Sequence, residues 1–175
     1  MTEMPAEVRD FVDEIDDVIY WDSSFAIAHF FEQLPSHTEC SNFVTRLMRE
    51  GVLCVSSDLV HNEVAFFIQR SYLSEHGARV GMHWREVHRR MPNALSAINA
   101  LLRRVRNELE AMTFHLPMPA NVRDDAYELM ERYHLLPTDA FHVAIALHHD
   151  VNAFASLDED FARVDGIVVY APKGF

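Results

Sequence analysis

Short runs of apolar residues alternate along this chain with longer stretches in which apolar residues recur at helical spacing. The runs are typical of buried strands, and they lie at 18–21, 52–55, 153–156 and 167–170. Helices are predicted over residues 25–31, 38–50, 58–72, 93–112, 122–133 and 138–147, and a short edge strand at 114–116. Strands alternating with helices predict an α/β fold whose central, mainly parallel sheet has helices on both faces.

The first 17 residues precede this alternation. Residues 1–17 are expected to add an amphipathic helix that runs from Pro5 to Asp17 and docks on the body of the protein. Acidic residues separate the apolar ones, which are Val8, Phe11, Val12 and Ile15.

Residues 79–112 are predicted to be a long arginine-bearing helical segment, made of two helices divided near Pro92. Seven arginines and one glutamate fall within 79–107, although the whole chain has a formal charge of −12. That overall charge argues against a broad nucleic-acid-coating surface, because phosphate binding depends largely on Lys and Arg. Any nucleic-acid contact is therefore expected to be local.

Composition predicts one compact domain, residues 1–175, because 49% of the residues are hydrophobic and 24% charged. Cys40 and Cys54 form no disulfide framework, which favours a reducing compartment. The N-terminal residues lack a secretory pattern, and no apolar stretch is long enough to cross a membrane. A cytoplasmic protein without a membrane partner is expected.

The stretch 135–161 is predicted to hold one buried helix and one buried strand. Between Ala140 and Leu147 only His142 is polar, so this helix is apolar around most of its circumference. Thr138 is the expected cap at its start. Asp139 opens the helix and Asp158 follows the strand, in places that converge on the edge of a parallel sheet where ligands bind.

Four carboxylates occupy such places, namely Asp22, Glu63, Asp139 and Asp158. Glu63 is notable because the residues three and four positions away on its helix are all apolar, so its carboxylate points toward the packed side and needs a compensating partner. Four carboxylates brought together repel unless a cation lies among them, and Mg²⁺ or Mn²⁺ prefers oxygen ligands. This pattern predicts a metal site suited to phosphodiester hydrolysis.

Each acid also has a structural interpretation. Asp139 can interact favourably with the helix dipole, Asp22 can cap the helix that follows it, and Asp158 can cap a turn. A second alternative is a histidine site at His148, His149 and Asp150, with His142 one turn from Asp139. No HExxH or finger spacing accompanies these histidines.

An aspartyl phosphatase is a further alternative, since an aspartate follows the first predicted strand. Such enzymes need a second acid two residues later, and Ser24 occupies that position.

The segments VIYWDSS, LVHNEV, PTDAFHVAIALHHDV and AFASLDEDF, in this order over residues 18–170, resemble PIN-domain proteins of the VapC toxin type. The resemblance implies a three-layer α/β/α PIN-like fold and a Mg²⁺- or Mn²⁺-dependent endoribonuclease with RNA as substrate. It maps an acidic quartet onto the four carboxylates and places Ser24 and Ser156 where a hydroxyl binds metal water or phosphate. It also implies a homodimer and an inhibitory antitoxin partner.

The segment before Val18 is additional to most such toxins, and the arginine-bearing helices look long. Arg103, Arg104 and Arg106 are the hypothetical RNA-facing strip, and a solvated helical face is the alternative. The functional alternative to the ribonuclease is a catalytically silent module of the same fold that binds protein or RNA.

Overall fold

The computed structural model describes residues 5–174 and contains a six-stranded sheet in which every pairing is parallel. The strand order is β1-β6-β5-β2-β3-β4. The strands are β1 (Glu7–Asp10), β2 (Val18–Trp21), β3 (Leu53–Ser56), β4 (Phe114–His115), β5 (Ala153–Ala155) and β6 (Val168–Ala171). The predicted parallel sheet is confirmed, with β4 as the predicted edge strand.

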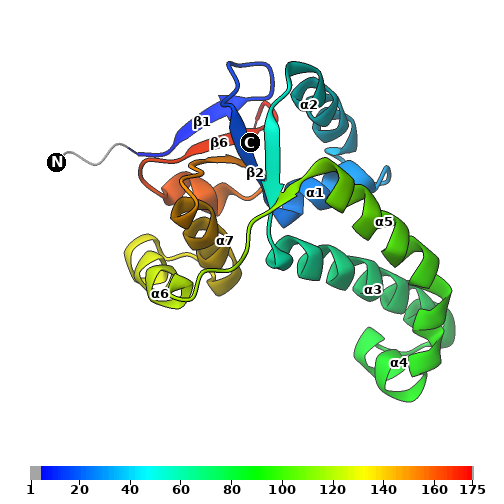
Figure 1. Cartoon of the computed structure of the whole chain (residues 1–175). Coiled ribbons are helices and arrows are strands. Elements are labelled where there is room, and N and C mark those ends of the chain that lie inside the picture. Colours follow the sequence, from blue (N-terminus) through cyan, green and yellow to red (C-terminus); the bar gives the residue numbers. More distant parts are fainter. Residues whose placement is uncertain (1–4, 175) are drawn as a thin grey trace.

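Seven α-helices accompany the sheet in the described part of the chain. They are α1 (Ser23–Phe30), α2 (His37–Glu50), α3 (Asp58–Val80), α4 (Trp84–Arg90), α5 (Asn99–Met112), α6 (Val122–Tyr133) and α7 (Pro137–His148), with 3₁₀ helices η1 (Pro92–Ile98) and η2 (Glu159–Arg163). Two helix pairs, α1 with α2 and α6 with α7, flank the sheet (Figure 1). The three-layer α/β/α architecture is therefore confirmed.

The arginine-bearing segment lies in an arm that projects from the sheet. In Figure 1, α3 and α5 extend away from the strands, and α4 lies at the far end of the arm. The predicted division near Pro92 is confirmed, but the helix predicted from Asn93 is a 3₁₀ helix as far as Ile98 and becomes an α-helix only from Asn99. Helix α3 continues to Val80 rather than ending near Tyr72, and Gly81 caps it in the left-handed conformation.

The predicted N-terminal helix is wrong. Residues 7–10 form β1, which pairs with β6, and residues 1–4 of the predicted segment lie outside the described residues. The acidic side chains favour a turn instead of a helix, because Asp13 accepts a hydrogen bond from the Asp10 backbone and Asp10 accepts one from Val12. Of the four apolar residues only Phe11 is buried, and its ring stacks on Phe43.

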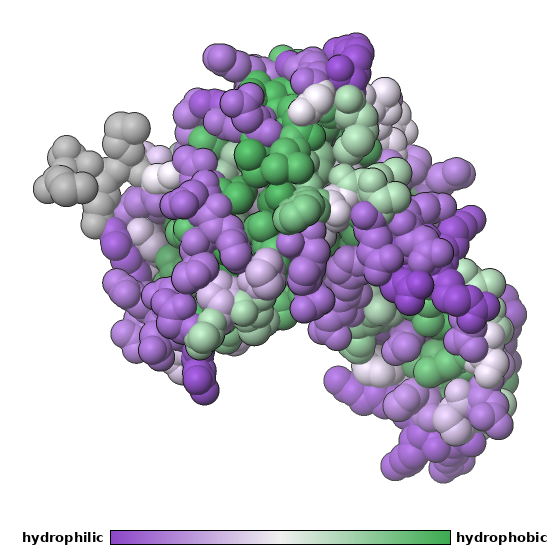
Figure 2. Space-filling model, viewed as in Figure 1, coloured by the Kyte–Doolittle hydropathy of each residue, from purple (hydrophilic) through white to green (hydrophobic). Residues whose placement is uncertain are grey.

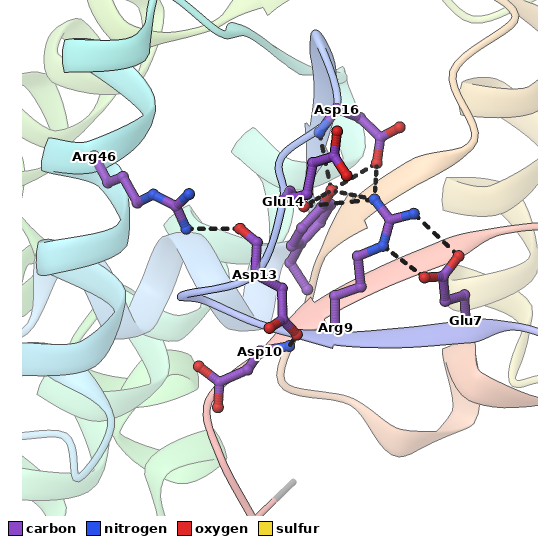
Figure 3. Close-up of polar contacts among 8 residues, drawn as sticks. Glu7, Arg9, Asp10, Asp13, Glu14, Asp16 and Arg46 are labelled. Carbon is purple, nitrogen blue, oxygen red and sulfur yellow. Dashed lines mark hydrogen bonds and ion pairs between the residues drawn. The ribbon is translucent and has the colours of Figure 1, made fainter.

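A polar network fastens this segment to the sheet (Figure 3). The guanidinium of Arg9 donates to Glu7, to Asp16 and to the hydroxyl of Tyr170 on β6. That hydroxyl also contacts the Asp16 carboxylate at 2.6 Å. From α2, Arg46 donates to the backbone oxygens of Phe11 and Asp13. These bonds join β1 and its turn to both β6 and α2.

The core lies between the sheet and its helices, and its largest fully buried side chains include Trp21, Tyr20, Tyr170 and Phe154. In residues 5–174, no helix combines the length and apolar character that crossing a membrane requires. Helix α7 begins at Pro137, and Thr138 makes no capping bond, so the predicted cap is wrong. This buried helix is held by packing, since Ala140, Val143 and Ile145 are fully covered.

Candidate metal centre

Asp22 lies directly after β2, at the N-cap of α1, and is only 3% exposed. Its Oδ2 accepts hydrogen bonds from the Ser24 backbone at 3.1 Å, the Ser24 hydroxyl at 2.6 Å and the Ser156 hydroxyl at 3.0 Å. The capping interpretation of Asp22 is therefore confirmed. The same three bonds fix the carboxylate, whose other oxygen, Oδ1, faces His142.

Glu63 finds its compensating partner on a helix far away in the sequence. The Nε2 of His142, on α7, donates to Glu63 Oε2 at 2.8 Å and lies 3.7 Å from Asp22 Oδ1. Each of these three residues offers one possible metal-binding atom, and the three atoms lie within 4.8 Å of one another. Among residues 5–174, Asp22, Glu63 and His142 thus form the convergent group of possible metal ligands. The structure thus brings Asp22 and Glu63 together.

The hydrogen bond between His142 and Glu63 shifts the pKa of both residues. Burial raises the pKa of Glu63, but the bond with His142 and a further bond with Ser23 outweigh it, so the net shift is downward. Burial lowers the pKa of His142, yet the bond to Glu63 and the charges of the neighbouring acids raise it overall. An ionised carboxylate thus faces a ring that favours its protonated form.

Asp139 lies one turn before His142, in the first turn of α7. Its Oδ2 is buried and has no hydrogen-bond partner in the structure. Burial, together with the charges of Asp158, Asp22 and Glu63, raises the pKa of Asp139 to about 7, although His142 opposes the shift. The charges of Asp158, Asp22 and Glu63 thus act on Asp139, although Asp139 and Asp158 are not part of the group whose ligand atoms converge within 4.8 Å among the described residues.

Asp158 follows β5 and caps η2, since its Oδ1 accepts a hydrogen bond from the Asp160 backbone at 2.9 Å. Its own backbone N–H donates to the Ser156 hydroxyl at 3.0 Å. Asp158 is the largest charge contribution to the raised pKa of Asp139. The capping interpretation is confirmed, and it is compatible with a place beside the other acids.

Ser24 and Ser156 have a clear structural part in this arrangement. Their hydroxyl oxygens lie 3.4 Å apart, and both donate to Asp22. The backbone N–H of Leu157 in turn donates to the Ser24 hydroxyl at 2.9 Å. These bonds join the end of β5 to the start of α1. Binding of metal water or phosphate by the two serines stays a prediction.

The predicted arginine strip lies apart from the acids. Arg103 and Arg106 line a cavity of about 730 Å³ between α3 and α5, whose floor includes Val64, Ile68 and Leu109. Arg104 and Arg106 each lie within 4 Å of a glutamate one turn further along α5, namely Glu108 and Glu110. Part of the positive charge on this helix is thus neutralised locally.

The alternative histidine site is not formed. His149 contacts the backbone oxygen of Pro117 through Nε2 at 2.9 Å. His148 stacks edge-on against the His149 ring, and neither residue belongs to the convergent group found in the described chain. Sequence reasoning underestimated His142. Its one signal was that it is the single polar residue on an otherwise apolar stretch of helix.

The residues present fit a hard divalent cation. A cation between the acids would give the buried Asp139 Oδ2 a partner and would offset the repulsion that, together with burial, raises the pKa of this residue. Carboxylate oxygens are the ligands that Mg²⁺ and Mn²⁺ share. Asp22, Glu63, Asp139 and Asp158 are the residues that would hold the ion.

Comparison with known proteins gives the family. The PIN domain matches residues 19–167, so the chain belongs to the PIN domain family. No curated protein sequence matches. Two solved structures share the fold. VapC20 of Mycobacterium tuberculosis, described as a sarcin-ricin loop cleaving toxin, has 19% identity and a TM-score of 0.50, with 82% of this chain and 92% of that chain covered.

The second structure is VapBC2 from Rickettsia felis, bound to a DNA fragment from its promoter. It has 11% identity and a TM-score of 0.55, and the alignment covers 87% of this chain and 96% of that chain. At these identities the likeness concerns the fold. The predicted membership of the PIN-domain family is thereby confirmed by the family model, and the fold is shared with two VapC-containing structures.

Proposed function

We propose that this PIN-domain protein is a metal-dependent endoribonuclease that acts as the toxin of a toxin–antitoxin pair. Its catalytic residues are Asp22, Glu63, Asp139 and Asp158, and its cofactor is Mg²⁺ or Mn²⁺. One observation carries the proposal: among the residues that the structure describes, a buried carboxylate oxygen of Asp139 has no hydrogen-bond partner, and burial together with the surrounding acids raises the pKa of this residue to about 7. A divalent cation would give that oxygen a partner and would offset the repulsion among the acids.

The protein residues prepare the pocket for phosphodiester chemistry. Ser24 and Ser156 hold the Asp22 carboxylate from one side, and His142 holds Glu63 from the other. Asp139 gives up its proton near neutral pH and then completes the set of ligands. When bound there, Mg²⁺ or Mn²⁺ supplies a water of lowered pKa and neutralises charge on the phosphate.

RNA is the proposed substrate because the fold resembles VapC20, a sarcin-ricin loop cleaving toxin. The surface over α3, α4 and α5 is largely hydrophilic, whereas hydrophobic residues reach the surface in the centre of the same view (Figure 2). We place the RNA backbone along α5, where Arg103 and Arg106 line the cavity beside α3. Reversing the charges of Arg103, Arg104 and Arg106 together would then reduce RNA affinity and its salt dependence.

The toxin assignment implies two protein partners, a second copy of this chain and an antitoxin. The fold of this chain resembles that of VapBC2 from Rickettsia felis, and this likeness supports the proposal of a protein partner. Light scattering on the purified chain tests the homodimer, with a monomeric mass as the contrary result. Expression of the chain alone is expected to arrest growth, and the Asp22→Asn variant is expected to relieve the arrest.

Cleavage of single-stranded and structured RNA by the purified protein tests the catalytic proposal. Cleavage is expected with Mg²⁺ or Mn²⁺, and none with EDTA or in the Asp22→Asn and Asp139→Asn variants. Cleavage that persists in both variants would identify a contaminating nuclease. RNA binding without cleavage in every metal would favour the alternative function, a catalytically silent binding module.

A further inference from the structure

His142 is completely buried, and both nitrogens of its ring have partners. Nε2 donates to Glu63 Oε2 at 2.8 Å, as described above. Nδ1 lies 2.7 Å from the hydroxyl oxygen of Tyr20 on β2 and shares a hydrogen bond with it. The ring therefore cannot rotate without losing a bond at each end, and its orientation toward the acidic pocket is fixed.

The chain of hydrogen bonds continues beyond Tyr20 and returns to the helix that carries Glu63. The Tyr20 hydroxyl lies 2.6 Å from the hydroxyl of Ser57, the N-cap residue of α3. Tyr20 and Ser57 are 0% and 1% exposed. The Ser57 side chain makes no capping bond to α3, since its hydroxyl is engaged with Tyr20. One buried chain thus joins α3, β2 and α7.

Glu63 needs such a restraint, because its side chain is 30% exposed and has rotamers that lead into water. The bond to His142 keeps its carboxylate in the pocket, where Asp22 Oδ1 also lies 3.7 Å from the same ring nitrogen. An ordinary core histidine would satisfy its nitrogens with backbone groups or water. This one is directed at two of the proposed ligands.

We propose that His142 is a positioning residue, which holds the Glu63 carboxylate in the orientation that the divalent cation requires, with Tyr20 and Ser57 as its support. The inference rests on the proposed function, since it concerns the same site. It adds three residues whose effect on metal binding is transmitted through Glu63. Although His142 Nε2 lies within 4.8 Å of the two carboxylates, it donates to Glu63 and so has no lone pair to offer the cation.

The affinity of the purified full chain for Mn²⁺, measured by electron paramagnetic resonance titration, tests this role without RNA. His142→Leu, which removes the donor at similar volume, is expected to weaken Mn²⁺ binding by about 10- to 100-fold. His142→Gln, which places an amide donor near the former Nε2, is expected to recover part of that loss. Tyr20→Phe removes a single oxygen and is expected to weaken binding by a smaller factor.

The Glu63→Ala background separates positioning from structural support. If His142 acts through Glu63, His142→Leu and Tyr20→Phe cause no further loss of Mn²⁺ affinity in that background. Losses of Mn²⁺ affinity that are the same with and without Glu63 would overturn the proposal. An unchanged Mn²⁺ affinity in His142→Leu would also overturn it. If His142→Leu does not fold, an unchanged affinity in Tyr20→Phe has the same meaning. RNA cleavage is scored separately, so a protein that binds Mn²⁺ but cleaves no RNA overturns only the proposed function.

Discussion

Asp139 and His142 lie one turn apart on α7, and the acidic pocket raises the pKa of both. The raised pKa keeps the Asp139 carboxyl neutral to about pH 7, and for His142 it favours the positive form of the ring. In the metal-free protein both shifts reduce the net negative charge of the pocket. A divalent cation performs the same neutralisation, and as a ligand Asp139 must first lose its proton, so the cation competes with the proton of Asp139.

The metal-free protein is expected to lose stability as the pH rises from about 4 to about 7. The folded state holds the Asp139 proton more tightly than the unfolded chain, whose value is near 3.8, so the unfolding free energy falls across this window. After allowance for solvent screening at this half-buried group, the loss is on the order of 1–2 kcal/mol. Urea unfolding in EDTA at several pH values measures it.

The Asp139→Asn variant is the control for that experiment. It keeps the shape of the side chain and has no proton to lose, so it should exceed the unsubstituted protein in stability at pH 8. Added Mn²⁺ should make the unsubstituted protein the more stable of the two, because its Asp139 carboxylate then binds the cation. Equal pH dependence in the two proteins would contradict the assignment of the raised pKa to Asp139.

Replacement of Tyr170 by phenylalanine is expected to loosen the N-terminal strand. The hydroxyl of Tyr170 contacts Arg9 at 3.0 Å and the Asp16 carboxylate at 2.6 Å, and its loss leaves these partners incompletely satisfied. A decrease of about 1–3 kcal/mol in unfolding free energy is expected. Tyr127→Phe, at a residue 59% exposed, is the matched control and should change stability little.

Gly77→Ala should destabilise the helical arm, although alanine normally favours a helix over glycine by about 1 kcal/mol. A Cβ at Gly77 would collide with the backbone oxygen of Met82, and the Met82 N–H bonds to the Gly77 oxygen at 2.9 Å. Thermal unfolding is expected to show a loss of about 1–3 kcal/mol. Ser74→Ala, on an exposed part of the same helix, should leave stability unchanged or raise it slightly.

Arg103 and Arg104 are neighbours on α5, and they should differ in their effect on RNA binding. Arg103 lines the cavity between α3 and α5, whereas Arg104 is 64% exposed and lies 3.9 Å from Glu108. Arg103→Ala should weaken RNA binding and lower the salt slope by about one, with a smaller effect for Arg104→Ala. Filter binding at several salt concentrations measures both. Equal effects of the two substitutions on RNA binding would indicate that the RNA does not lie along the cavity between α3 and α5.

The buried strands were predictable from sequence because each is a run of apolar residues that ends at polar ones, as at Trp21 and Asp22. The N-terminal strand was not predictable in this way. The spacing of Val8, Phe11 and Val12 fits a helix, but the segment is fixed by pairing with β6, at the other end of the chain. Local periodicity carries no information about such a distant partner.

The convergence of Asp22 and Glu63 was predictable for a related reason: the ends of parallel strands and the helices that follow them meet at one edge of the sheet. What could not be predicted was how each acid is satisfied. The partner of Glu63 is His142, 79 residues away, and the second partner of that histidine is Tyr20 on β2. These contacts arise from packing, and no spacing in the sequence encodes them.

A crystal grown with Mn²⁺ and measured at the manganese absorption edge tests the central claim most directly. We expect an anomalous peak among the carboxylates of Asp22, Glu63 and Asp139, with Asp139 Oδ2 as a ligand, and no such peak in Asp139→Asn crystals. A peak held by other residues, or an acidic pocket that stays free of manganese at saturating concentration, would contradict it.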